Sequence, residues 1–194
     1  MCIRDSVLIA DKIKQDSSKT IRELKAMNIK ETVMLTGDKK EVGEYVAKKL
    51  NMDKVYTELL PDGKVEKVEE LLKQKSEKGK LVFVGDGIND APVLTISDIG
   101  VAMGGLGSDA AIEAADIVIM TDETSKISKA INLSKKTMRI VRENIIFAIF
   151  VKIAVLVLTA FGASTMWEAV FADVGVSVIA IINALRMLNI KKFE

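Results

Sequence analysis

Short apolar runs alternate with amphipathic stretches over the first two thirds of the chain. Between the runs, apolar residues recur three or four positions apart, the spacing typical of helices that bury one face. The runs are rich in valine and isoleucine and end in glycine, aspartate or threonine, which is typical of strands. Strands are therefore expected at residues 5–10, 32–35, 54–56, 82–84, 99–102 and 116–119. The apolar run directly before Gly85 predicts that the strand at 82–84 is buried. Strands that alternate with helices in this way predict an α/β fold with a mostly parallel sheet.

Capping residues indicate where the expected helices begin and end. Ser17-Ser18 can cap the first helix, and Pro61 suits the first turn of the third. Asn51 is expected to end the second helix, and Gly79 the third. The apolar side of the second helix is expected to consist of Val42, Val46 and Leu50.

The last third of the chain consists of two long apolar stretches. A helix without proline can run from Thr124 or Ser125 to about Ala160, with a kink near Asn144 as an open alternative. Residues 144–162 and 166–188 each approach the roughly 20 residues needed to cross a bilayer. Basic residues precede the first stretch and follow the second, whereas the turn between them carries none. This predicts a transmembrane hairpin with both ends in the cytoplasm; a buried helical pair of a soluble protein is the alternative.

Composition limits the classes of function. The 28 basic and 27 acidic residues nearly balance, so nothing indicates binding to nucleic acid. The chain has one cysteine and no histidine, which excludes a disulfide framework and a Cys/His zinc site within it.

Polar residues follow two of the expected parallel strands. Thr36-Gly37-Asp38 follows the strand at 32–35, and the stretch from Gly85 to Pro92, which contains Asp86, Asn89 and Asp90, follows the strand at 82–84. Right-handed crossovers place such loops at one edge of a sheet, where α/β proteins bind ligands. We expect Lys64, near the start of a helix, to reach the same crevice. The alternatives are that the aspartates and Asn89 only cap helices and that Lys64 is solvated.

These residue types suit phosphoryl transfer with magnesium. The Thr36 hydroxyl and the Gly37 amide can donate to phosphate oxygens, and Lys64 can act as a mobile cation. Asp86 is the best candidate for a direct Mg²⁺ ligand, and Asp90 is a candidate ligand or a supporting residue. Asn89 is expected to be a hydrogen-bonding neighbour of the phosphate, with Gly85 and Gly87 beside it in the same loop.

The string Gly85-Asp86-Gly87-Ile88-Asn89-Asp90-Ala91-Pro92 resembles the hinge motif of P-type ATPases, cation pumps whose phosphorylation domain belongs to the haloacid dehalogenase superfamily. In this order, Thr36-Gly37-Asp38, Lys64 and the hinge string are similar to the second, third and fourth motifs of that superfamily. The resemblance covers residues 7–190 and makes Thr36, Gly37, Asp38 and Lys64 the expected catalytic residues. It implies Mg²⁺ and ATP as cofactors, with ATP bound mainly by an upstream domain.

The match departs from the family at its nucleophile. The string Asp-Lys-Thr-Gly-Thr, which bears the phosphorylated aspartate, is absent, as is the nucleotide-binding insertion. The chain therefore resembles the C-terminal part of a pump, whose missing N-terminal part would be its partner, and alone it should not turn over ATP. The nucleophile's strand lies at the centre of the family's sheet, so its loss should leave two unpaired strand edges or force them together. We expect low stability for residues 1–120 alone.

Two charged residues inside the apolar spans indicate the subtype. Lys152 and Asp173 are costly to bury in lipid, so they are functional candidates. Asn144 followed by Lys152, and then Asp173-Val174-Gly175, resemble the signature of pumps that export zinc, cadmium and lead. The resemblance implies that Asp173 binds the transported ion and that Lys152 is its counter-ion when the metal has left. Snorkelling of Lys152 to the interface is the alternative.

The expected fold class is α/β, an incomplete, Rossmann-like haloacid dehalogenase-type parallel sheet followed by a transmembrane α-helical hairpin. The chain is expected to be part of a multi-pass protein in the plasma membrane of a prokaryote. Residues 1–143 and the C-terminus are expected to lie in the cytoplasm. Two other functions remain open, a membrane-anchored haloacid dehalogenase-type phosphatase and a non-catalytic membrane fragment. The expected segments are a non-native leader (1–6), the C-terminal part of a phosphorylation domain (7–122), a helical stalk (123–143), the membrane helices (144–162 and 166–188) and a tail (189–194).

Overall fold

The structure is a computed structural model that describes residues 13–85, 88–104, 109–121, 123–162 and 166–188. The chain divides into two compact units, residues 1–128 and residues 129–194. The leader, the strand at 5–10 and the tail lie outside the described residues, as do Asp86 and Gly87.

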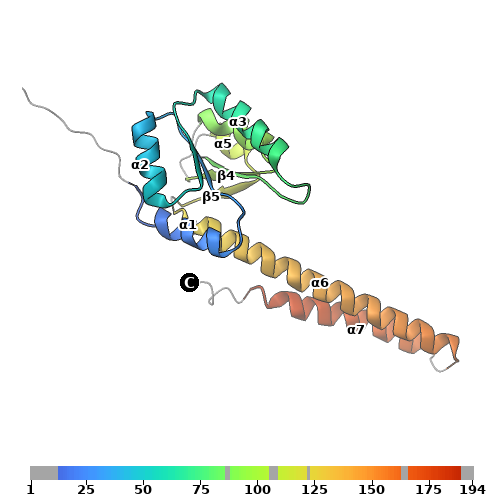
Figure 1. Ribbon diagram of the computed structural model, residues 1–194. Coiled ribbons are helices and arrows are strands. Elements are labelled where there is room, and N and C mark those ends of the chain that lie inside the picture. Colours follow the sequence, from blue (N-terminus) through green and yellow to red (C-terminus); the bar gives the residue numbers. More distant parts are fainter. Residues whose placement is uncertain (1–12, 86–87, 105–108, 122, 163–165, 189–194) are drawn as a thin grey trace, which may run out of the picture. The chain divides into compact units, whose positions relative to one another are not determined.

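Helices and strands alternate through the first unit, as the apolar pattern predicts (Figure 1). The α/β fold class is confirmed. The elements are α1 (Ser17–Ala26), β1 (Val33–Leu35), α2 (Lys40–Leu50), β2 (Lys54–Tyr56), α3 (Pro61–Gln74), β3 (Val82–Gly85), the 3-10 turn η1 (Ile88–Asp90), α4 (Ala91–Ile96), β4 (Ile99–Met103), α5 (Asp109–Ala114) and β5 (Ile117–Ile119).

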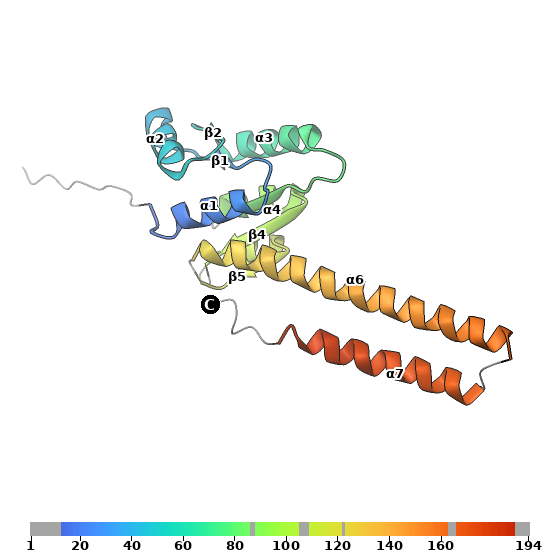
Figure 2. The same cartoon turned by 60° about the horizontal axis from the view of Figure 1, so that its bottom comes forward.

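The strands form two parallel sheets instead of one. β1 pairs with β2, and β3, β4 and β5 form a second sheet in that order. Figure 2 shows β1 and β2 apart from β4 and β5. In the part of the chain that the structure describes, β1 and β3 are not hydrogen-bonded to each other, so each has a free edge. Among the described strands, this arrangement agrees with the first of the two outcomes expected from the resemblance.

The core of the first unit lies where α4 and α5 cover the three-stranded sheet. Leu94, Ala102 and Ala111 are buried together there. A Cβ on Gly100 would lie 2.6 Å from the carbonyl oxygen of Leu94, so glycine lets α4 approach β4 closely. The expectation that β3 is buried is wrong for one face: Val82 and Val84 are exposed, because β3 is an edge strand and no described element covers these side chains.

Each pair of neighbouring strands is fastened at its start by an aspartate. The carboxylates of Asp53, Asp98 and Asp116, each directly before a strand, accept hydrogen bonds of 2.8 Å from the backbone amides of Thr32, Leu81 and Gly100. These three aspartates therefore lie at the opposite strand ends from the motif loops. They fix the register at which each strand begins.

Asp53 and Asp98 are held by cations as well as by amides. The Lys25 ammonium, with the Thr32 hydroxyl and amide, lowers the pKa of Asp53 from 3.8 to about 2. The Leu81 amide, with smaller contributions from Lys80 and Lys75, also lowers the pKa of Asp98. Both carboxylates therefore stay ionised to a lower pH than a free aspartate does.

Two expectations about helix ends need correction. Asp16, not Ser17-Ser18, is the N-cap of α1, because the Asp16 carbonyl accepts the first helical hydrogen bond, from Thr20. α3 ends at Gln74 and not at Gly79, because Lys75 is extended and its ammonium binds Asp98.

The buried side of α2 also differs from the expectation. It is formed by Gly43 and Ala47, whereas Val42 is 46% exposed. A Cβ on Gly43 would collide with the side chain of Thr57, so small residues face inward where α2 packs closely. The predicted helix end is confirmed, since Asn51 is the C-cap in the left-handed conformation.

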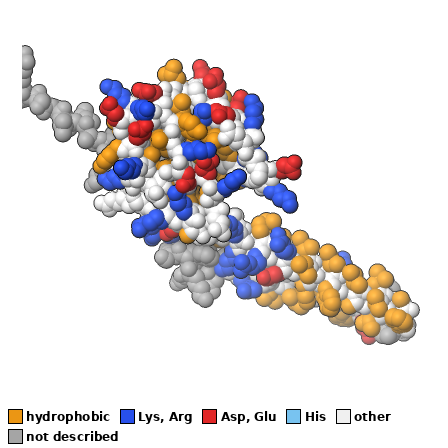
Figure 3. Space-filling view, viewed as in Figure 1, with side chains coloured by type: hydrophobic (Ala, Val, Ile, Leu, Met, Phe, Trp, Pro, Cys, Tyr) orange, Lys and Arg blue, Asp and Glu red, His pale blue; other side chains and the backbone are white. Residues whose placement is uncertain are grey.

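The second unit consists of the remainder of α6 (Ser125–Ala160) and α7 (Met166–Leu185). α6 is one continuous helix of 36 residues that includes Asn144. By length and composition it could cross a membrane. The apolar part of α7, Val170–Leu185, is shorter, and α7 ends three residues before the expected boundary at 188. Apolar side chains cover the hairpin surface (Figure 3). Their exposure argues against the buried helical pair of a soluble protein.

Candidate functional site

The loop after β1 is closed by hydrogen bonds between its own residues. The Thr36 hydroxyl donates to Asp38 Oδ2 at 2.8 Å, and the Asp38 amide donates to the Thr36 hydroxyl at 3.1 Å. The N-cap of α2 is Lys39, and no side chain of the described residues caps this helix. The helix-cap alternative for Thr36 and Asp38 therefore lacks the contact that it requires.

The backbone of the segment before α3 is hydrogen-bonded to this loop. The amide of Glu58 donates to the Asp38 carbonyl at 2.9 Å, and the amide of Leu59 donates to the Thr36 carbonyl at 3.1 Å. Gly37 lies against the same segment, since a Cβ there would be 3.3 Å from the Leu59 carbonyl oxygen. The first turn of α3, which carries Lys64, is thereby placed beside the Thr36 loop.

Lys64 forms an ion pair with Asp90. The Lys64 Nζ lies 2.8 Å from Asp90 Oδ1, and the two side chains are only 18% and 12% exposed. Lys64 comes from α3 and Asp90 from η1, which follows the carboxyl end of β3. Lys64 is therefore not the solvated helix residue of the alternative interpretation. Because each group neutralises the other, both side chains can remain charged although they are largely buried.

Gly85 makes room for Asp90. A Cβ on Gly85 would lie 2.8 Å from Asp90 Cβ and 2.9 Å from Asp90 Oδ2, closer than atoms can approach. Glycine at the end of β3 therefore lets the carboxylate lie against the strand. Asn89, next to it, is exposed.

The donor chemistry of this edge fits magnesium only in part. Asp90 offers a hard carboxylate oxygen of the kind that Mg²⁺ prefers. Within the described ranges, no group of three or more acidic, histidine or cysteine side chains could hold a metal ion. Further ligands would have to come from Asp86 or from outside the described residues.

A second ion pair lies on the hairpin. The Lys152 Nζ is 3.2 Å from Asp173 Oδ1, so the cation of α6 meets the carboxylate of α7. Both side chains line a groove between the helices together with Val155 and Val170, and they are 68% and 64% exposed. The lysine ammonium therefore has a carboxylate partner on the neighbouring helix.

Sequence reasoning missed a chain of side-chain amides on the same hairpin. Asn144 Nδ2 donates to the Ala180 carbonyl at 3.1 Å, and Asn183 Nδ2 donates to Asn144 Oδ1 at 2.8 Å. Arg186 Nη1 donates to Asn183 Oδ1 at 2.9 Å. A signal was available, because Asn144 and Asn183 are the only side-chain amides in the two apolar stretches.

Sequence reasoning also missed the contacts between α1 and the first turn of α6, all within the first unit. The Asp16 carboxylate accepts from the Ser125 amide, which lowers the pKa of Asp16. The hydroxyls of Thr20 and Thr124 are hydrogen-bonded at 3.2 Å, and the buried Ser128 hydroxyl donates to Glu23. Nothing in the local sequence indicates these partners, which are more than a hundred residues apart.

Comparison with known proteins identifies the relatives of the chain. Residues 3–95 match the family of haloacid dehalogenase-like hydrolases. The cadmium, zinc and cobalt-transporting ATPase of Bacillus subtilis (strain 168) is 57% identical over 186 residues, which are 96% of this chain and 26% of that protein. The zinc-transporting ATPase of Synechocystis sp. is 54% identical over 181 residues, 93% of this chain and 25% of that protein.

A solved structure agrees with these relatives. The crystal structure of a zinc-transporting PIB-type ATPase in the E2.Pi state matches with a TM-score of 0.84 and 37% identity, over 92% of this chain and 28% of that chain. The chain spans about a quarter of the length of the curated relatives it matches. In sequence and in fold, the chain is therefore similar to about a quarter of a cadmium- or zinc-transporting ATPase.

Proposed function

We propose that this chain is the C-terminal part of an ATP-driven pump that exports divalent heavy-metal ions through an aspartyl-phosphate intermediate. Residues 7–122 would then complete a phosphorylation domain, and residues 123–143 would be its stalk. The observation that carries the proposal is the Lys152–Asp173 pair on two apolar helices. A phosphatase held by a simple anchor has no need of two charges within its apolar helices, because charges in lipid are costly.

The residues at the carboxyl edge would handle the phosphoryl group. The Thr36 hydroxyl and Gly37 amide would bind phosphate oxygens, with Asp38 orienting that hydroxyl through their 2.8 Å hydrogen bond. Lys64 would stabilise the phosphate charge, with Asp90 holding the ammonium in place, and Asn89 would add a hydrogen bond beside Gly85 and Gly87. Asp86 and Asp90 would hold Mg²⁺, which, when bound, neutralises phosphate charge. In such a pump, the nucleophilic aspartate and most of the ATP site would lie in a part outside this chain.

The hairpin would carry the transported ion. Asp173 offers a carboxylate to a divalent cation, which is the substrate. Lys152 forms an ion pair with that carboxylate when the ion is absent. Lys152 and the incoming ion compete for the same negative charge, so binding of the ion displaces the ammonium. This competition gives Asp173 a neutralising partner both before and after the ion leaves.

Charge along the helices supports the membrane orientation. Basic residues lie on α6 just before its apolar part and on the turn after α7. The positive-inside rule then puts residues 1–143 and the C-terminus in the cytoplasm, with the hairpin as part of a multi-pass plasma membrane protein. The bilayer is thus a further proposed partner.

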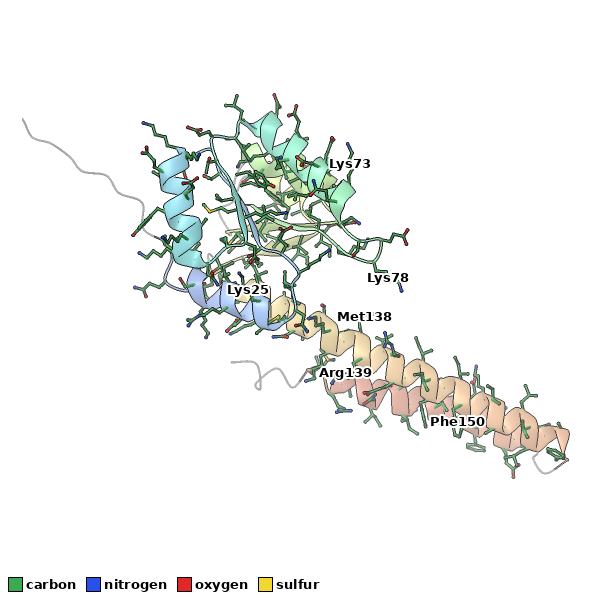
Figure 4. All side chains as sticks on the ribbon, in the orientation of Figure 1. Lys25, Lys73, Lys78, Met138, Arg139 and Phe150 are labelled. Carbon is green, nitrogen blue, oxygen red and sulfur yellow. The ribbon has the colours of Figure 1, made fainter. Side chains whose placement is uncertain are left out.

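A chimera tests the proposal. The matching quarter of the Bacillus subtilis ATPase is replaced by this chain and expressed in a zinc-sensitive bacterium that lacks its own exporter. We expect restored growth in zinc or cadmium, lost in Lys64→Ala and in Asp173→Ala. Lys73→Ala, an exposed lysine of α3 marked in Figure 4, is the matched control and should keep full growth. A membrane-inserted chimera that gives no resistance, or an active Asp173→Ala variant, would refute the proposal.

The phosphatase alternative has its own assay. The isolated chain is incubated with p-nitrophenyl phosphate and Mg²⁺. We expect no turnover, because no aspartate of this chain stands in the nucleophile's sequence context. Turnover that disappears in Lys64→Ala would replace the pump proposal with a phosphatase. Growth restored by the chimera would in turn exclude a non-catalytic membrane fragment.

A further inference from the structure

A groove opens between α6 and α7 near the end of the hairpin that carries Arg186. Its cavity volume is about 390 Å³. Phe147, Ile179 and Ile182 form an apolar wall, whereas Glu143, Asn183 and Arg186 form a polar end. The groove is therefore amphipathic, with a cation at the end where α7 stops.

Arg186 is held in place at this polar end. Its Nη1 donates to Asn183, whose own amide donates to Asn144 on the neighbouring helix. A guanidinium carries five N–H donors in a planar fork, and this contact uses one of them. The remaining donors suit a phosphate group, which arginine binds with two parallel hydrogen bonds.

The surroundings of the groove add positive charge. Arg139 and Arg142 lie on α6 just before the groove, and both are exposed. Arg139 is one helical turn before Glu143 on the same face, so the single acid of the groove is offset by a base at i, i+4 spacing. Figure 4 marks Arg139 before the apolar part of α6 and Phe150 within it, and Figure 3 shows basic side chains giving way to apolar ones along the helix.

We infer that this groove binds an anionic phospholipid, with its phosphate on Arg186 and one acyl chain along Phe147, Ile179 and Ile182. A free phosphate ion would use the arginine but not the apolar wall, whereas a phospholipid uses both. Bases next to the membrane end of a helix attract anionic lipids, at about fivefold in affinity per base. The inference rests on the proposed insertion of α6 and α7 in a bilayer.

The experiment measures lipid binding to the full 194-residue chain. The chain is reconstituted in phosphatidylcholine nanodiscs, transferred to detergent and analysed by native mass spectrometry with phosphatidylglycerol or phosphatidylcholine. We expect one phosphatidylglycerol to be retained in preference to phosphatidylcholine, and inorganic phosphate not to displace it. Arg186→Gln should reduce the preference about fivefold. Ile179→Trp, which fills the groove without changing charge, should also remove the retained lipid.

Lys129→Gln is the matched control, because it removes one exposed base about 20 Å before Arg142 along α6. Since that distance exceeds the Debye length of about 10 Å, the preference should stay unchanged. Equal losses in Lys129→Gln and Arg186→Gln, retention in Ile179→Trp, or no headgroup preference would overturn the inference. Protease protection of the hairpin in the nanodisc separates the two claims. Failure to insert refutes the membrane proposal, whereas insertion without lipid preference refutes only the groove.

Discussion

The carboxylate of Asp16 accepts a hydrogen bond of 3.0 Å from the backbone amide of Ser125, the first residue of α6. The first amides of a helix have no partner within the helix, so Asp16 satisfies one of them from a distant segment. Its negative charge also lies at the positive end of the α6 dipole. α1 thereby holds the first turn of the helix that continues into the hairpin.

Replacing Asp16 should weaken this junction. Asp16→Ala removes the acceptor for the Ser125 amide, and we expect it to lower the free energy of unfolding by about 1 kcal/mol, as for loss of a helix cap. Urea unfolding of the chain in nanodiscs, followed by pulse proteolysis, measures the loss. Glu41→Ala, an exposed acid in the first turn of α2, is the control and should change stability by less than about 0.5 kcal/mol. Equal effects would show that the junction adds nothing.

Asp53 should make the first unit sensitive to acid. Its pKa is about 2 in the folded chain and 3.8 by reference, so its stabilising effect is complete above pH 4 and is lost as the pH falls from 4 to 2. The loss should be about 1 kcal/mol, because the side chain is 39% exposed and partly screened. Unfolding curves at pH 5 and pH 2.5 measure it. Asp53→Asn should be less stable at pH 5 and less pH-dependent, whereas Asp62→Asn should follow the parent chain.

The periodic pattern predicted the elements of the first unit well because strand and helix formation depends on local spacing. β1, β2, β3, β4 and β5 all lie at expected positions, within one or two residues. Exposure was harder to predict, because it depends on what covers a side chain. Val42, Val82 and Val84 were expected inside and are exposed. The division of the strands into two sheets could not be predicted from spacing alone, and the expectation of unpaired strand edges came from the resemblance.

The candidate site was predictable in position but not in detail. Right-handed crossovers indicated that the Thr36 loop, Lys64 and Asp90 would lie at one edge, and the structure links them through Leu59 and the Lys64–Asp90 pair. The direct ion pair was not foreseen, because Lys64 was assigned to phosphate and Asp90 to magnesium. Partners such as Asp16 and Ser125 leave no local pattern, since their contact depends on the tertiary fold.

Gly85 should tolerate no side chain. Gly85→Ala would bring a Cβ within 2.9 Å of the Asp90 carboxylate, and we expect a loss of about 1–3 kcal/mol in the free energy of unfolding. Gly63→Ala is the matched control, because its Cβ would meet only Leu59 Cδ2, at 3.7 Å. There alanine favours the helix, and stability should rise by about 0.5–1 kcal/mol. A Gly85→Ala chain as stable as the parent would mean that Asp90 is not confined by the strand end.

The Lys64–Asp90 pair should show strong energetic coupling. Lys64→Ala leaves a carboxylate that is 12% exposed without its cation, so we expect a loss of about 2 kcal/mol, below the range of about 3–5 kcal/mol for fully buried pairs. Asp90→Ala should cost a similar amount, and the double variant should cost less than the sum, because no uncompensated charge remains. Urea unfolding of the four chains gives the coupling energy.

The exposed pair Lys40–Glu44 provides the comparison for this cycle, at 3.9 Å with side chains 70% and 55% exposed. Its coupling should be below about 0.5 kcal/mol, because water screens it. If the two pairs coupled equally, Lys64 would be a surface cation without a defined partner, and its proposed role beside the phosphate would lose its structural support. If only Lys64 and Asp90 couple strongly, a bound phosphate must compete with Asp90 for the same ammonium. Adding phosphate should then lower the measured coupling.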